Sequence, residues 1–491
     1  MVTDYSSGRR IALGTAVKSI GEVLAKLASV AFYIVIAREL GDSDFGNVVF
    51  AISLSGVLFS ISAFGTDSLV TREVARDDAR AEHLLGAVMS LKLLFGFGLL
   101  MVMVGIVLIQ GYSQEAGTAI VLIGLGVGLE TVTKTVYSIF VARGQIHYEA
   151  ITLILERFIV TAVGIPAVLL GAGLVVVAVI FAAGSVVGLG VALFWLWRSG
   201  WPGWRLNRSR WVSVIKAGIP IGLITILYGA LLKIDIALLS FLNGGDNAEV
   251  GHYGAAYRMI ESTMFISWSF SAALFPWLSR DAAIGAGRVY RLGLKILIAV
   301  LMPMALIFGL YAAQIIHLLY GSEYDDAIVP LRVLSSMIVL YGINSMVVLV
   351  LITRDRPWDY AAPATLVIVQ NLVFNVILIP LYGATGAAAN AVISGIILAI
   401  ITHRQVARIF KDIALPSICI SIGAASLVMA GVIVATRSVP WIPAGILATL
   451  LYVITFAVIE RFAFPEDFSH YAGVLAPVRR FLPSLGRRLP S

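Results

Sequence analysis

Ionisable side chains interrupt the apolar stretches of this sequence at helical spacing. Lys18, Glu22 and Lys26 follow one another at intervals of four residues, so one helix face would carry a positive, a negative and a positive group. Glu130 and Lys134 repeat that interval. Each such group costs about 2.5–3.5 kcal/mol in hydrocarbon unless it faces protein or water. We therefore expect these side chains to point into the interior of a helical bundle.

The complete set of ionisable groups in the apolar stretches has a surplus of positive charge. Seven are basic and five are acidic: Lys18, Glu22, Lys26, Lys92, Glu130, Lys134, Glu156, Arg157, Lys233, Asp235, Arg258 and Glu261. Even complete pairing would leave two cations, which predicts a hydrated cavity suited to an anion. The alternative for any one residue is a helix-to-helix ion pair or a snorkelling lysine, and Lys18 and Lys92 are well placed to snorkel.

Motifs of catalysis are absent from the sequence. The six histidines and the single cysteine, Cys419, show no spacing typical of a metal site. There is neither a phosphate-binding Gly-x-x-x-x-Gly-Lys-Ser/Thr loop nor a Gly-x-Ser-x-Gly nucleophile elbow. We predict that the protein is not an enzyme and has no cofactor. Any transport would then draw on a proton or sodium gradient, the membrane potential or the substrate's own gradient.

The apolar stretches themselves predict an all-α, polytopic membrane protein. Hydrophobic residues make up 59% of the 491 residues and charged residues only 13%, and the mean hydropathy is +0.96. Runs of about 20 apolar residues, the length that crosses a bilayer as a helix, recur between short polar breaks. They predict about fourteen transmembrane helices, at residues 12–38, 46–66, 84–110, 116–142, 149–171, 174–197, 216–242, 251–278, 290–313, 328–352, 358–382, 386–403, 415–436 and 441–460.

The loops between these stretches differ in charge on the two sides of the membrane. Arginines dominate one set of loops, which includes both terminal regions, whereas the other set is mainly acidic with Arg38 and Arg437 as exceptions. The positive-inside rule therefore predicts that both termini are cytoplasmic. The net charge is +7, but because the basic residues lie in short loops rather than along one soluble face, we predict no nucleic-acid partner. The basic tail after Arg461 is expected to contact anionic lipid.

A weak internal repeat divides the chain. Residues 45–46 and 71–73, Phe-Gly and Thr-Arg-Glu, match residues 253–254 and 279–281, Tyr-Gly and Ser-Arg-Asp, at the same separation. The copies keep the same orientation, which predicts two six-helix lobes with pseudo-two-fold symmetry about the membrane normal. We expect these lobes at residues 1–198 and 199–413, transmembrane helices 13 and 14 at 414–461, and a basic cytoplasmic tail at 462–491.

Short motifs along nearly the whole chain carry a family resemblance. In the first half they are Ile-Ala-Arg-Glu-Leu-Gly at 36–41, Asp-Phe-Gly at 44–46, Phe-Gly at 64–65 and Thr-Arg-Glu at 71–73. In the second half they are Lys-Ile-Asp at 233–235, Gly-His-Tyr-Gly-Ala-Ala-Tyr-Arg at 251–258, Phe-Pro at 275–276, Leu-Tyr-Gly-Ser-Glu-Tyr at 319–324, Asn375, and Ile-Pro-Leu-Tyr-Gly at 379–383. Together they resemble the polysaccharide and O-antigen flippases of the multidrug, oligosaccharidyl-lipid and polysaccharide exporter superfamily.

The resemblance implies a flippase of the cell (plasma or inner) membrane. Such a protein carries a polyprenyl-diphosphate-linked oligosaccharide from the cytoplasmic to the outer leaflet by alternating access, for surface polysaccharide or glycan assembly. Its implied partners are this lipid-linked oligosaccharide, membrane lipids, and glycosyltransferases or a polysaccharide polymerase, with the protein itself a monomer. The residues that we predict to bind the anionic substrate are Lys18, Lys26, Lys92, Lys233 and Arg258, with Arg72 and Arg280 at the cytoplasmic mouth. Glu22 or Asp235 is predicted to take the coupling proton or sodium ion.

Three other functions are compatible with the sequence. An ion-coupled multidrug or organic-cation antiporter of the same superfamily has the same architecture, although its cavity should favour acidic residues. A membrane scaffold that recruits glycosyltransferases would not need the intramembrane lysines. An enzyme acting on lipid-linked sugar would need a paired-carboxylate or metal motif, which the sequence lacks. Arg72 and Arg280 also fit a role as positive-inside anchors.

Overall fold

The computed structural model describes residues 4–203, 210–244, 247–278, 285–356, 358–410 and 415–468. Within these ranges, the side chains at 4–23, 220, 221, 224, 228, 276, 415 and 416 are left out of the description. The described residues form helices joined by short turns, without a strand. The prediction of an all-α protein is therefore confirmed.

Two of the helices are long enough to cross a membrane twice. The helices are α1 (Asp4–Ala63), α2 (Thr66–Arg76), η1 (Asp78–Arg80), α3 (Ala81–Gln110), α4 (Gln114–Ala142), α5 (Ile146–Leu169), α6 (Leu174–Arg198), α7 (Trp211–Leu242), α8 (Ala248–Leu278), α9 (Ala286–Leu310), α10 (Ala312–Leu319), η3 (Ser322–Ala327), α11 (Ile328–Leu334), α12 (Met337–Thr353), α13 (Trp358–Ile409), α14 (Leu415–Ala435) and α15 (Trp441–Ala463). α1 and α13 are each interrupted by a glycine with a positive φ angle, Gly41 at 81° and Gly383 at 52°. Because glycine adopts such angles without steric strain, each glycine ends one membrane segment and begins the next.

Divided at these glycines, the described chain has the predicted fourteen spans. Ten described helices are long and apolar enough to cross a membrane, or eleven if the bent pair 322–334 and 337–353 is one span. That number counts α1 and α13 once each, although each is long enough to cross twice. It also omits α8, which Glu249, Arg258 and Glu261 make more polar. Counting α1 and α13 twice, and adding α8 to the eleven, gives fourteen spans. The predicted span at 328–352 is not one straight helix, since its two parts meet at 43°.

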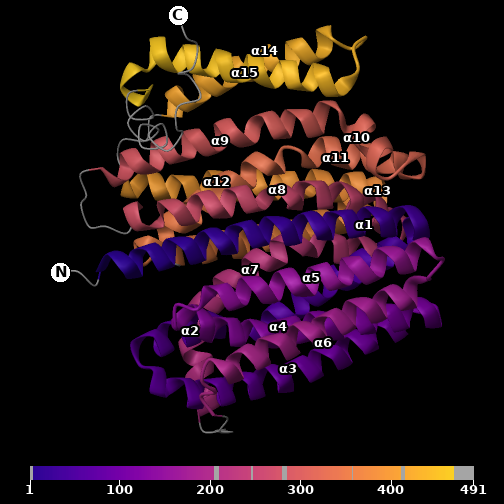
Figure 1. Cartoon of the computed structure of the whole chain (residues 1–491). Coiled ribbons are helices and arrows are strands. Elements are labelled where there is room, and N and C mark those ends of the chain that lie inside the picture. Colours follow the sequence, from indigo (N-terminus) through magenta and orange to yellow (C-terminus); the bar gives the residue numbers. More distant parts are fainter. Residues whose placement is uncertain are drawn as a thin grey trace, which may run out of the picture.

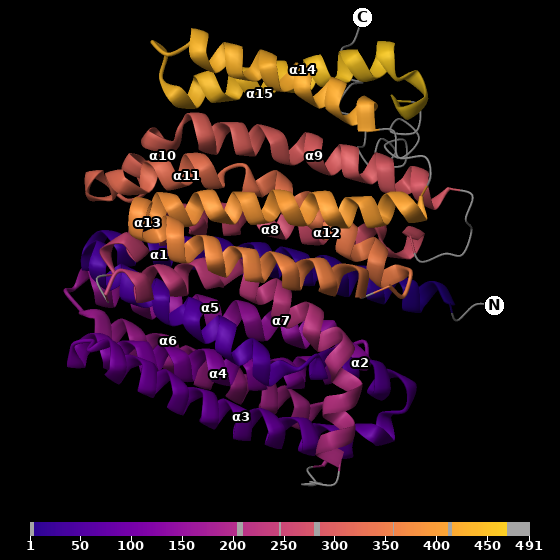
Figure 2. The same ribbon diagram turned by 180° about the vertical axis from the view of Figure 1, so that it is seen from behind.

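The helices run side by side and form one layered bundle (Figure 1). α1 lies near the middle and packs against α4, α5, α7 and α8, so it contacts helices from before and after residue 199. α14 and α15 pack on each other and on α9 at one edge, whereas α3 lies at the opposite edge. Seen from behind, α7 extends to α2 and α3 (Figure 2). The boundaries of the two lobes stay predictions.

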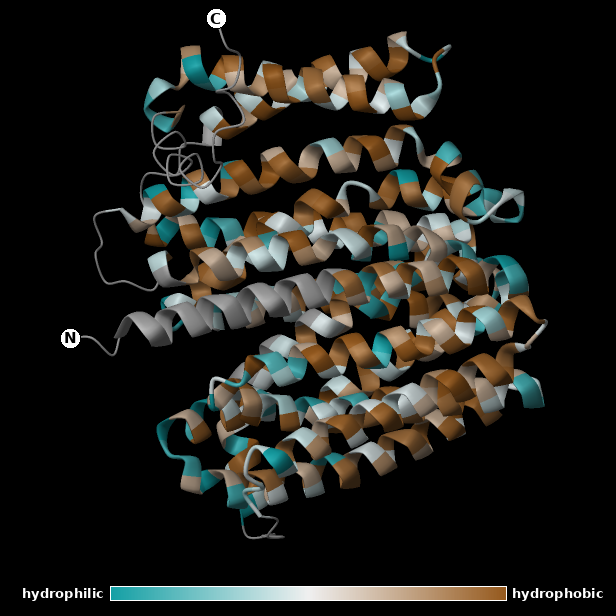
Figure 3. Cartoon of the chain, in the orientation of Figure 1, coloured by the Kyte–Doolittle hydropathy of each residue, from teal (hydrophilic) through white to brown (hydrophobic). Residues whose placement is uncertain are grey.

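The two ends of the bundle differ in charge. The basic end carries Arg72, Arg76, Arg80, Arg143 and Arg198, and the acidic end carries Asp42, Asp44, Glu115, Glu323 and Asp325. Apolar residues cover the helices between these ends (Figure 3). Arg38 is an exception at the acidic end, where its Nε donates to the carbonyl oxygen of Leu319 at 2.7 Å. This carbonyl lies at the negative end of the α10 helix dipole, which compensates the arginine charge.

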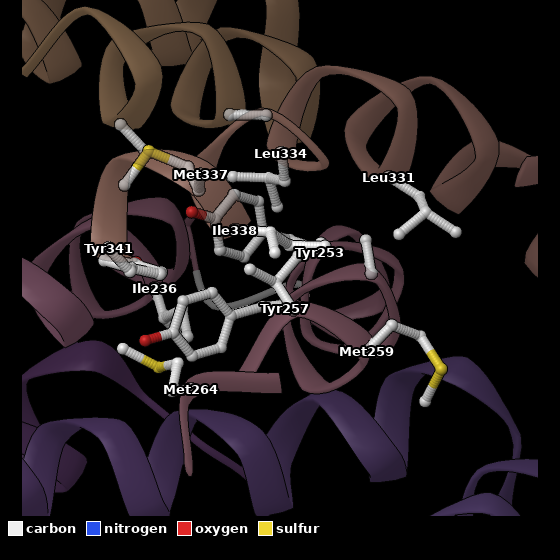
Figure 4. Close-up of a cluster of buried hydrophobic side chains, with 14 of the residues drawn as sticks. Ile236, Tyr253, Tyr257, Met259, Met264, Leu331, Leu334, Met337, Ile338 and Tyr341 are labelled. Carbon is white, nitrogen blue, oxygen red and sulfur yellow. The ribbon is translucent and has the colours of Figure 1, made fainter. Parts of the chain in front are cut away.

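Large apolar side chains pack between the helices that follow residue 199. Tyr253 and Tyr257 of α8 are buried beside Ile338 and Tyr341 of α12 (Figure 4). On the outside of the bundle, large hydrophobic residues such as Phe97 of α3 are exposed. Because lipid tails are themselves apolar, exposed hydrophobic side chains suit a membrane and the polar groups are left to the interior.

Candidate functional site: a cationic cavity

A cavity of about 600 Å³ lies between α1, α2, α4, α5, α6, α7 and α8. Eight ionisable side chains line it: Lys26, Asp67, Glu130, Lys134, Arg157, Lys233, Arg258 and Glu261. Five of them are basic and three are acidic, so a surplus of positive charge surrounds one space. Low-dielectric walls focus the field of such a surplus, and this lining therefore favours an anionic ligand.

Two of the five cations have a carboxylate beside them. Nη2 of Arg157 lies 2.7 Å from Oε1 of Glu130, and Nη1 of Arg258 lies 2.7 Å from Oε2 of Glu261. Arg258 also stacks on Tyr33 of α1, with 4.0 Å between its guanidinium carbon and the ring centroid. These contacts hold both arginines in place and neutralise most of their charge.

Asp67, the third carboxylate, is neutralised from outside the cavity. Nζ of Lys92 lies 2.6 Å from Oδ1 of Asp67 and donates to the backbone oxygen of Thr131 at 2.9 Å. Lys92 is buried on α3 and is not part of the cavity lining. Its ammonium group therefore joins α3 to α2 and α4.

The remaining three cations, Lys26, Lys134 and Lys233, form no ion pair with a carboxylate of the described part of the chain. Lys233 lies against Gly56 of α1, where an added Cβ would come within 2.8 Å of the lysine Cδ. Nζ of Lys26 lies 5.7 Å from the ring centroid of Phe265. Three ammonium groups, from α1, α4 and α7, thus line one cavity without forming an ion pair among the described residues.

The predicted substrate residues have different positions. Lys26, Lys233 and Arg258 line the cavity, whereas Lys92 lies behind its wall. Arg72 is exposed on α2 at the basic end, outside the cavity lining, and its Nε lies 3.4 Å from Oε1 of Glu73. The structure therefore brings together three of the five intramembrane cations that the sequence nominated.

Some predicted residues lie outside the described part of the chain, and one cavity lysine was missed. The side chains of Lys18 and Glu22, and all of Arg280, lie outside the described residues. Lys134 was not among the predicted substrate residues, although its four-residue spacing from Glu130 was a signal. That spacing also fits an ordinary intrahelical pair, and the sequence does not reveal that Glu130 pairs with Arg157 of α5 instead.

Asp235 lies in a separate polar cluster between α7 and α13. Its Oδ1 accepts hydrogen bonds from Nδ2 of Asn371 at 2.9 Å and from Nδ2 of Asn375 at 2.6 Å. Asn371 also donates to Oγ of Ser394 at 3.1 Å. All four side chains are buried, and Oδ1 of Asn375 has no hydrogen-bond partner among the described residues. Oxygens of this kind suit a proton or a hard cation such as Na⁺.

A hydrogen-bond chain closes the acidic end. Nδ2 of Asn247 donates to Oδ1 of Asn47 at 2.7 Å, Oγ of Ser240 donates to Oδ1 of Asn247 at 2.6 Å, and the Tyr112 hydroxyl lies 2.6 Å from the same Oγ. Burial raises the pKa of the Tyr112 phenol, which keeps it protonated as a hydrogen-bond partner. A Cβ added at Gly46 would overlap the backbone oxygen of Asn247, so α1 and α8 are in backbone contact here.

A second close contact joins α7 to the turn between α1 and α2 near the basic end. Gly65 has a φ angle of 65°, and an added Cβ would overlap α7 at Gly218 and Gly222. Conversely, a Cβ at Gly218 or Gly222 would overlap the backbone of Phe64. Glycines on both sides therefore allow the two backbones to touch. The cavity lies between this contact and the one at the acidic end.

Comparison with known proteins gives a family and a relative. Residues 11–281 match the model of the family described as "Polysaccharide biosynthesis protein". The chain is 25% identical over 368 residues to "Probable low-salt glycan biosynthesis flippase Agl15" of Haloferax volcanii, which corresponds to 73% of this chain and 75% of that protein.

Two solved structures share the fold. The lipid II flippase MurJ, in an inward closed conformation, superposes with a TM-score of 0.76 at 17% identity, over 90% of this chain and 98% of that one. An inward-facing multidrug resistance MATE family transporter of the MOP superfamily gives a TM-score of 0.63 at 17% identity, over 79% and 96%. At these identities the likeness concerns the fold alone.

Proposed function

The chain belongs to the polysaccharide biosynthesis protein family, and from this premise we propose that it is a flippase for a polyprenyl-diphosphate-linked oligosaccharide. The substrate moves from the cytoplasmic to the outer leaflet of the cell membrane and serves surface polysaccharide or glycan assembly. The similarity to the Haloferax volcanii protein, a probable glycan biosynthesis flippase, supports this substrate class. No covalent bond is made or broken in the transport step.

The observation that carries the proposal is the set of three cavity lysines that form no ion pair among the described residues. Lys26, Lys134 and Lys233 line the same cavity, from three different helices. Unpaired ammonium groups are costly in a membrane unless a ligand or water compensates them. A diphosphate carries at least two negative charges on adjacent groups, so it can bridge ammonium groups that come from separate helices. An organic cation would be repelled by the same lining.

The basic end is cytoplasmic in this proposal, and both termini lie on that side. Arg72, exposed on α2, then stands where a headgroup in the cytoplasmic leaflet would approach, and Arg280 has the same role in the second lobe. We assign Lys92 a supporting role, because it neutralises Asp67 and so leaves the cavity lysines in excess. Lys18, whose side chain lies outside the described residues, is proposed from its spacing to Lys26 to bind the same substrate.

The two close contacts that flank the cavity support transport by alternating access. Opening the basic end requires α7 to separate from the turn at Gly65, and opening the acidic end requires Asn247 to separate from Asn47. Backbone contacts at glycines and short polar chains can break and re-form without exposing a large apolar core. The two lobes rock about the cavity, and each contact closes when the other opens.

The coupling ion is proposed to bind at Asp235, with Glu22 as the second candidate from the sequence. The carboxylate of Asp235 and Oδ1 of Asn375, which has no partner among the described residues, supply oxygen ligands in a buried setting. α7 carries both Asp235 and the cavity residue Lys233. A proton or sodium ion at Asp235 would therefore alter the position of a helix that also binds the substrate.

A multidrug or organic-cation antiporter is the alternative, and the fold shared with a MATE family transporter supports it. The charge of the cavity favours the flippase instead. The protein is proposed to act as a monomer beside membrane lipids, with glycosyltransferases or a polysaccharide polymerase as the enzymes that supply or consume its substrate.

A leaflet assay separates the two functions. Purified protein is reconstituted in liposomes with a fluorescent polyprenyl-diphosphate oligosaccharide, and the fraction accessible to an external quencher is followed over time. The expected result is faster exchange of this lipid than in protein-free liposomes, with no acceleration for a neutral polyprenyl glycoside as the matched control. Proton-coupled uptake of an organic cation, without lipid exchange, would establish the antiporter and end the flippase proposal.

A further inference from the structure

Arg437 is a cation at the acidic end of the bundle, outside the central cavity. It is exposed in the turn between α14 and α15. Arg38, the other basic exception at this end, donates to the carbonyl oxygen of Leu319. The side chain of Arg437, in contrast, forms neither an ion pair nor a hydrogen bond with any described residue. Its guanidinium N–H groups are therefore available to a ligand.

A second cavity, of about 400 Å³, adjoins Arg437 between the junction of α9 with α10 and the turn from α14 to α15. Tyr311, Gln314 and Trp441 also line it. The rings of Tyr311 and Trp441 pack on each other, with 5.8 Å between their centroids. Gln314 is exposed on α10, and its side-chain amide has no hydrogen-bond partner in the described part of the chain. A guanidinium group and an amide with unused donors thus line the same space.

The hydroxyl of Tyr311 is a further polar group without a partner. Tyr311 is 6% exposed, and its hydroxyl forms no hydrogen bond among the described residues. Buried hydroxyl groups are usually hydrogen-bonded, because leaving one unpartnered is unfavourable. Since Tyr311 lines the cavity, a ligand there can supply the missing acceptor. Guanidinium, amide and hydroxyl groups all donate, so together they suit a negatively charged ligand rich in oxygen atoms.

The cavity beside Arg437 lies where three apolar spans end. The spans Ala286–Leu310 and Ser417–Ala435 end beside it, and Trp441–Ala463 begins there. The ends of spans lie at the level of the lipid headgroups, where tryptophan and tyrosine are enriched. α14 and α15 form one edge of the bundle (Figure 1), so the cavity faces the surrounding lipid.

Apolar side chains complete the lining of this cavity. Leu310, Val434 and Val439 contribute to it and are exposed. A free inorganic anion leaves such side chains uncovered, whereas the chains attached to a lipid headgroup cover them. Basic groups between membrane helices at headgroup level are suited to anionic lipids. The lining therefore favours a lipid over a dissolved anion.

We propose that this cavity binds the phosphate headgroup of a lipid in the leaflet at the acidic end. Arg437 binds the phosphate oxygens, and Tyr311 and Gln314 donate to the other oxygens of the headgroup. Trp441 packs against the apolar stem below the phosphate. A bulk anionic phospholipid and a polyprenyl diphosphate present the same phosphate chemistry. The site does not depend on the proposed function, and only its assignment to the outer leaflet rests on the proposed topology.

Native mass spectrometry of the purified full chain tests the site. The probes are phosphatidylglycerol, a polyprenyl diphosphate, and diacylglycerol as a matched lipid without phosphate. The wild-type protein should retain at least one of the two phosphate lipids and much less diacylglycerol. Arg437→Gln should retain one phosphate lipid fewer, because the affinity of this site falls at least about tenfold when a charged donor is lost. Arg332→Gln, which removes an exposed arginine of α11 outside the lining, should match the wild type.

The two phosphate lipids distinguish the sources of the headgroup. Loss of phosphatidylglycerol in Arg437→Gln assigns the site to bulk phospholipid. Loss of the polyprenyl diphosphate alone, observed also when Lys26→Gln and Lys233→Gln weaken the central cavity, assigns it to the isoprenoid lipid. If flipping fails in the leaflet assay while Arg437→Gln still loses one phosphatidylglycerol, the proposed function is wrong and this site stands.

Tyr311→Phe separates lipid binding from folding. Without added lipid, its thermal unfolding midpoint in detergent should be no lower than that of the wild type, because the lost hydroxyl has no partner among the described residues. The retained phosphate lipid should raise this midpoint less than in the wild type, since the variant binds the headgroup more weakly. Equal numbers of bound lipids in wild-type and folded Arg437→Gln protein, or no preference for phosphate lipids over diacylglycerol, overturns the inference.

Discussion

The side-chain amide of Asn247, the residue before α8, donates to Oδ1 of Asn47 at 2.7 Å and so joins the start of α8 to the second half of α1. The residues are 200 positions apart in the sequence. Directly beside them, Gly46 touches the backbone of Asn247. This contact closes the acidic end, while the contact of Gly222 with Phe64 lies near the basic end. If alternating access is correct, the two contacts must respond in opposite ways to mutation.

Gly46→Val should hold the acidic end open, because its side chain would overlap the carbonyl oxygen of Asn247. In a Cys419→Ser background, which removes the single native cysteine, a cysteine introduced at the cavity residue Ser262 reports access. We expect a membrane-impermeant thiol reagent on the outer side to label it at least about tenfold faster in Gly46→Val, a shift of roughly 1.4 kcal/mol in the conformational equilibrium.

Gly222→Val is the matched variant at the other contact, where a Cβ would overlap Phe64. It should leave outer labelling of Ser262→Cys slow and raise labelling from the cytoplasmic side. Gly105→Val controls for the added bulk, since a Cβ there meets no atom within 4 Å. Equal labelling of both variants from both sides would contradict alternating access.

Neutralising two cavity lysines should weaken substrate binding without unfolding the protein. In Lys26→Gln with Lys233→Gln, the two ammonium groups removed form no ion pair among the described residues, and the neighbouring Glu261 keeps Arg258 at 2.7 Å as its partner. Hydrogen bonds to charged groups contribute about 1.5–3 kcal/mol each. We expect the flipping rate of the diphosphate-linked lipid at low concentration to fall by at least about tenfold.

Lys216→Gln provides the control for this double variant, because Lys216 is exposed on the same helix as Lys233 and does not line the cavity. Its flipping rate should equal that of the wild type. A double variant that stays folded and flips the lipid at the wild-type rate would remove the main support for the flippase.

Asp235→Asn should uncouple transport from the ion gradient. Asparagine is similar in size and can still accept a hydrogen bond from Asn371 or Asn375, but it cannot bind a proton or neutralise Na⁺. The expected result is a flipping rate that no longer responds to an imposed proton or sodium gradient, measured in the leaflet assay. Asp326→Asn, exposed at the acidic end, should respond like the wild type; an unchanged response in Asp235→Asn would place the coupling ion elsewhere.

Lys295→Met should destabilise the attachment of α15 to α9. Nζ of Lys295 lies 2.7 Å from Oε1 of Glu460 and 3.1 Å from Oδ2 of Asp467, and all three residues are buried. Removing the only lysine of this cluster leaves buried carboxylates with less compensation, at a cost of about 3–5 kcal/mol. The thermal unfolding midpoint in detergent should fall clearly, whereas Lys216→Met should change it little. Equal midpoints would show that the cluster carries no net stability.

The sequence by itself determined the membrane class, the number of spans and the charge of the interior. Apolar runs such as residues 174–197 have no other stable arrangement, since every backbone polar group must be satisfied inside lipid. The sequence also shows the surplus of cations in the membrane, because the seven basic and five acidic residues of the apolar stretches can be counted without knowing their positions in space. Gly41 and Gly383 marked breaks between spans, since each is a glycine beside an apolar run.

Only the tertiary structure decided which charges remain unpaired. From the sequence, Lys92 and Lys233 are equivalent lysines in apolar helices, but Lys92 contacts Asp67 of another helix and Lys233 lines the cavity. Likewise Glu130 pairs with Arg157 across helices rather than with Lys134 four residues away. The rotation of each helix about its axis fixes these partners, and that rotation depends on packing with distant helices. Local spacing carries too little information to specify it.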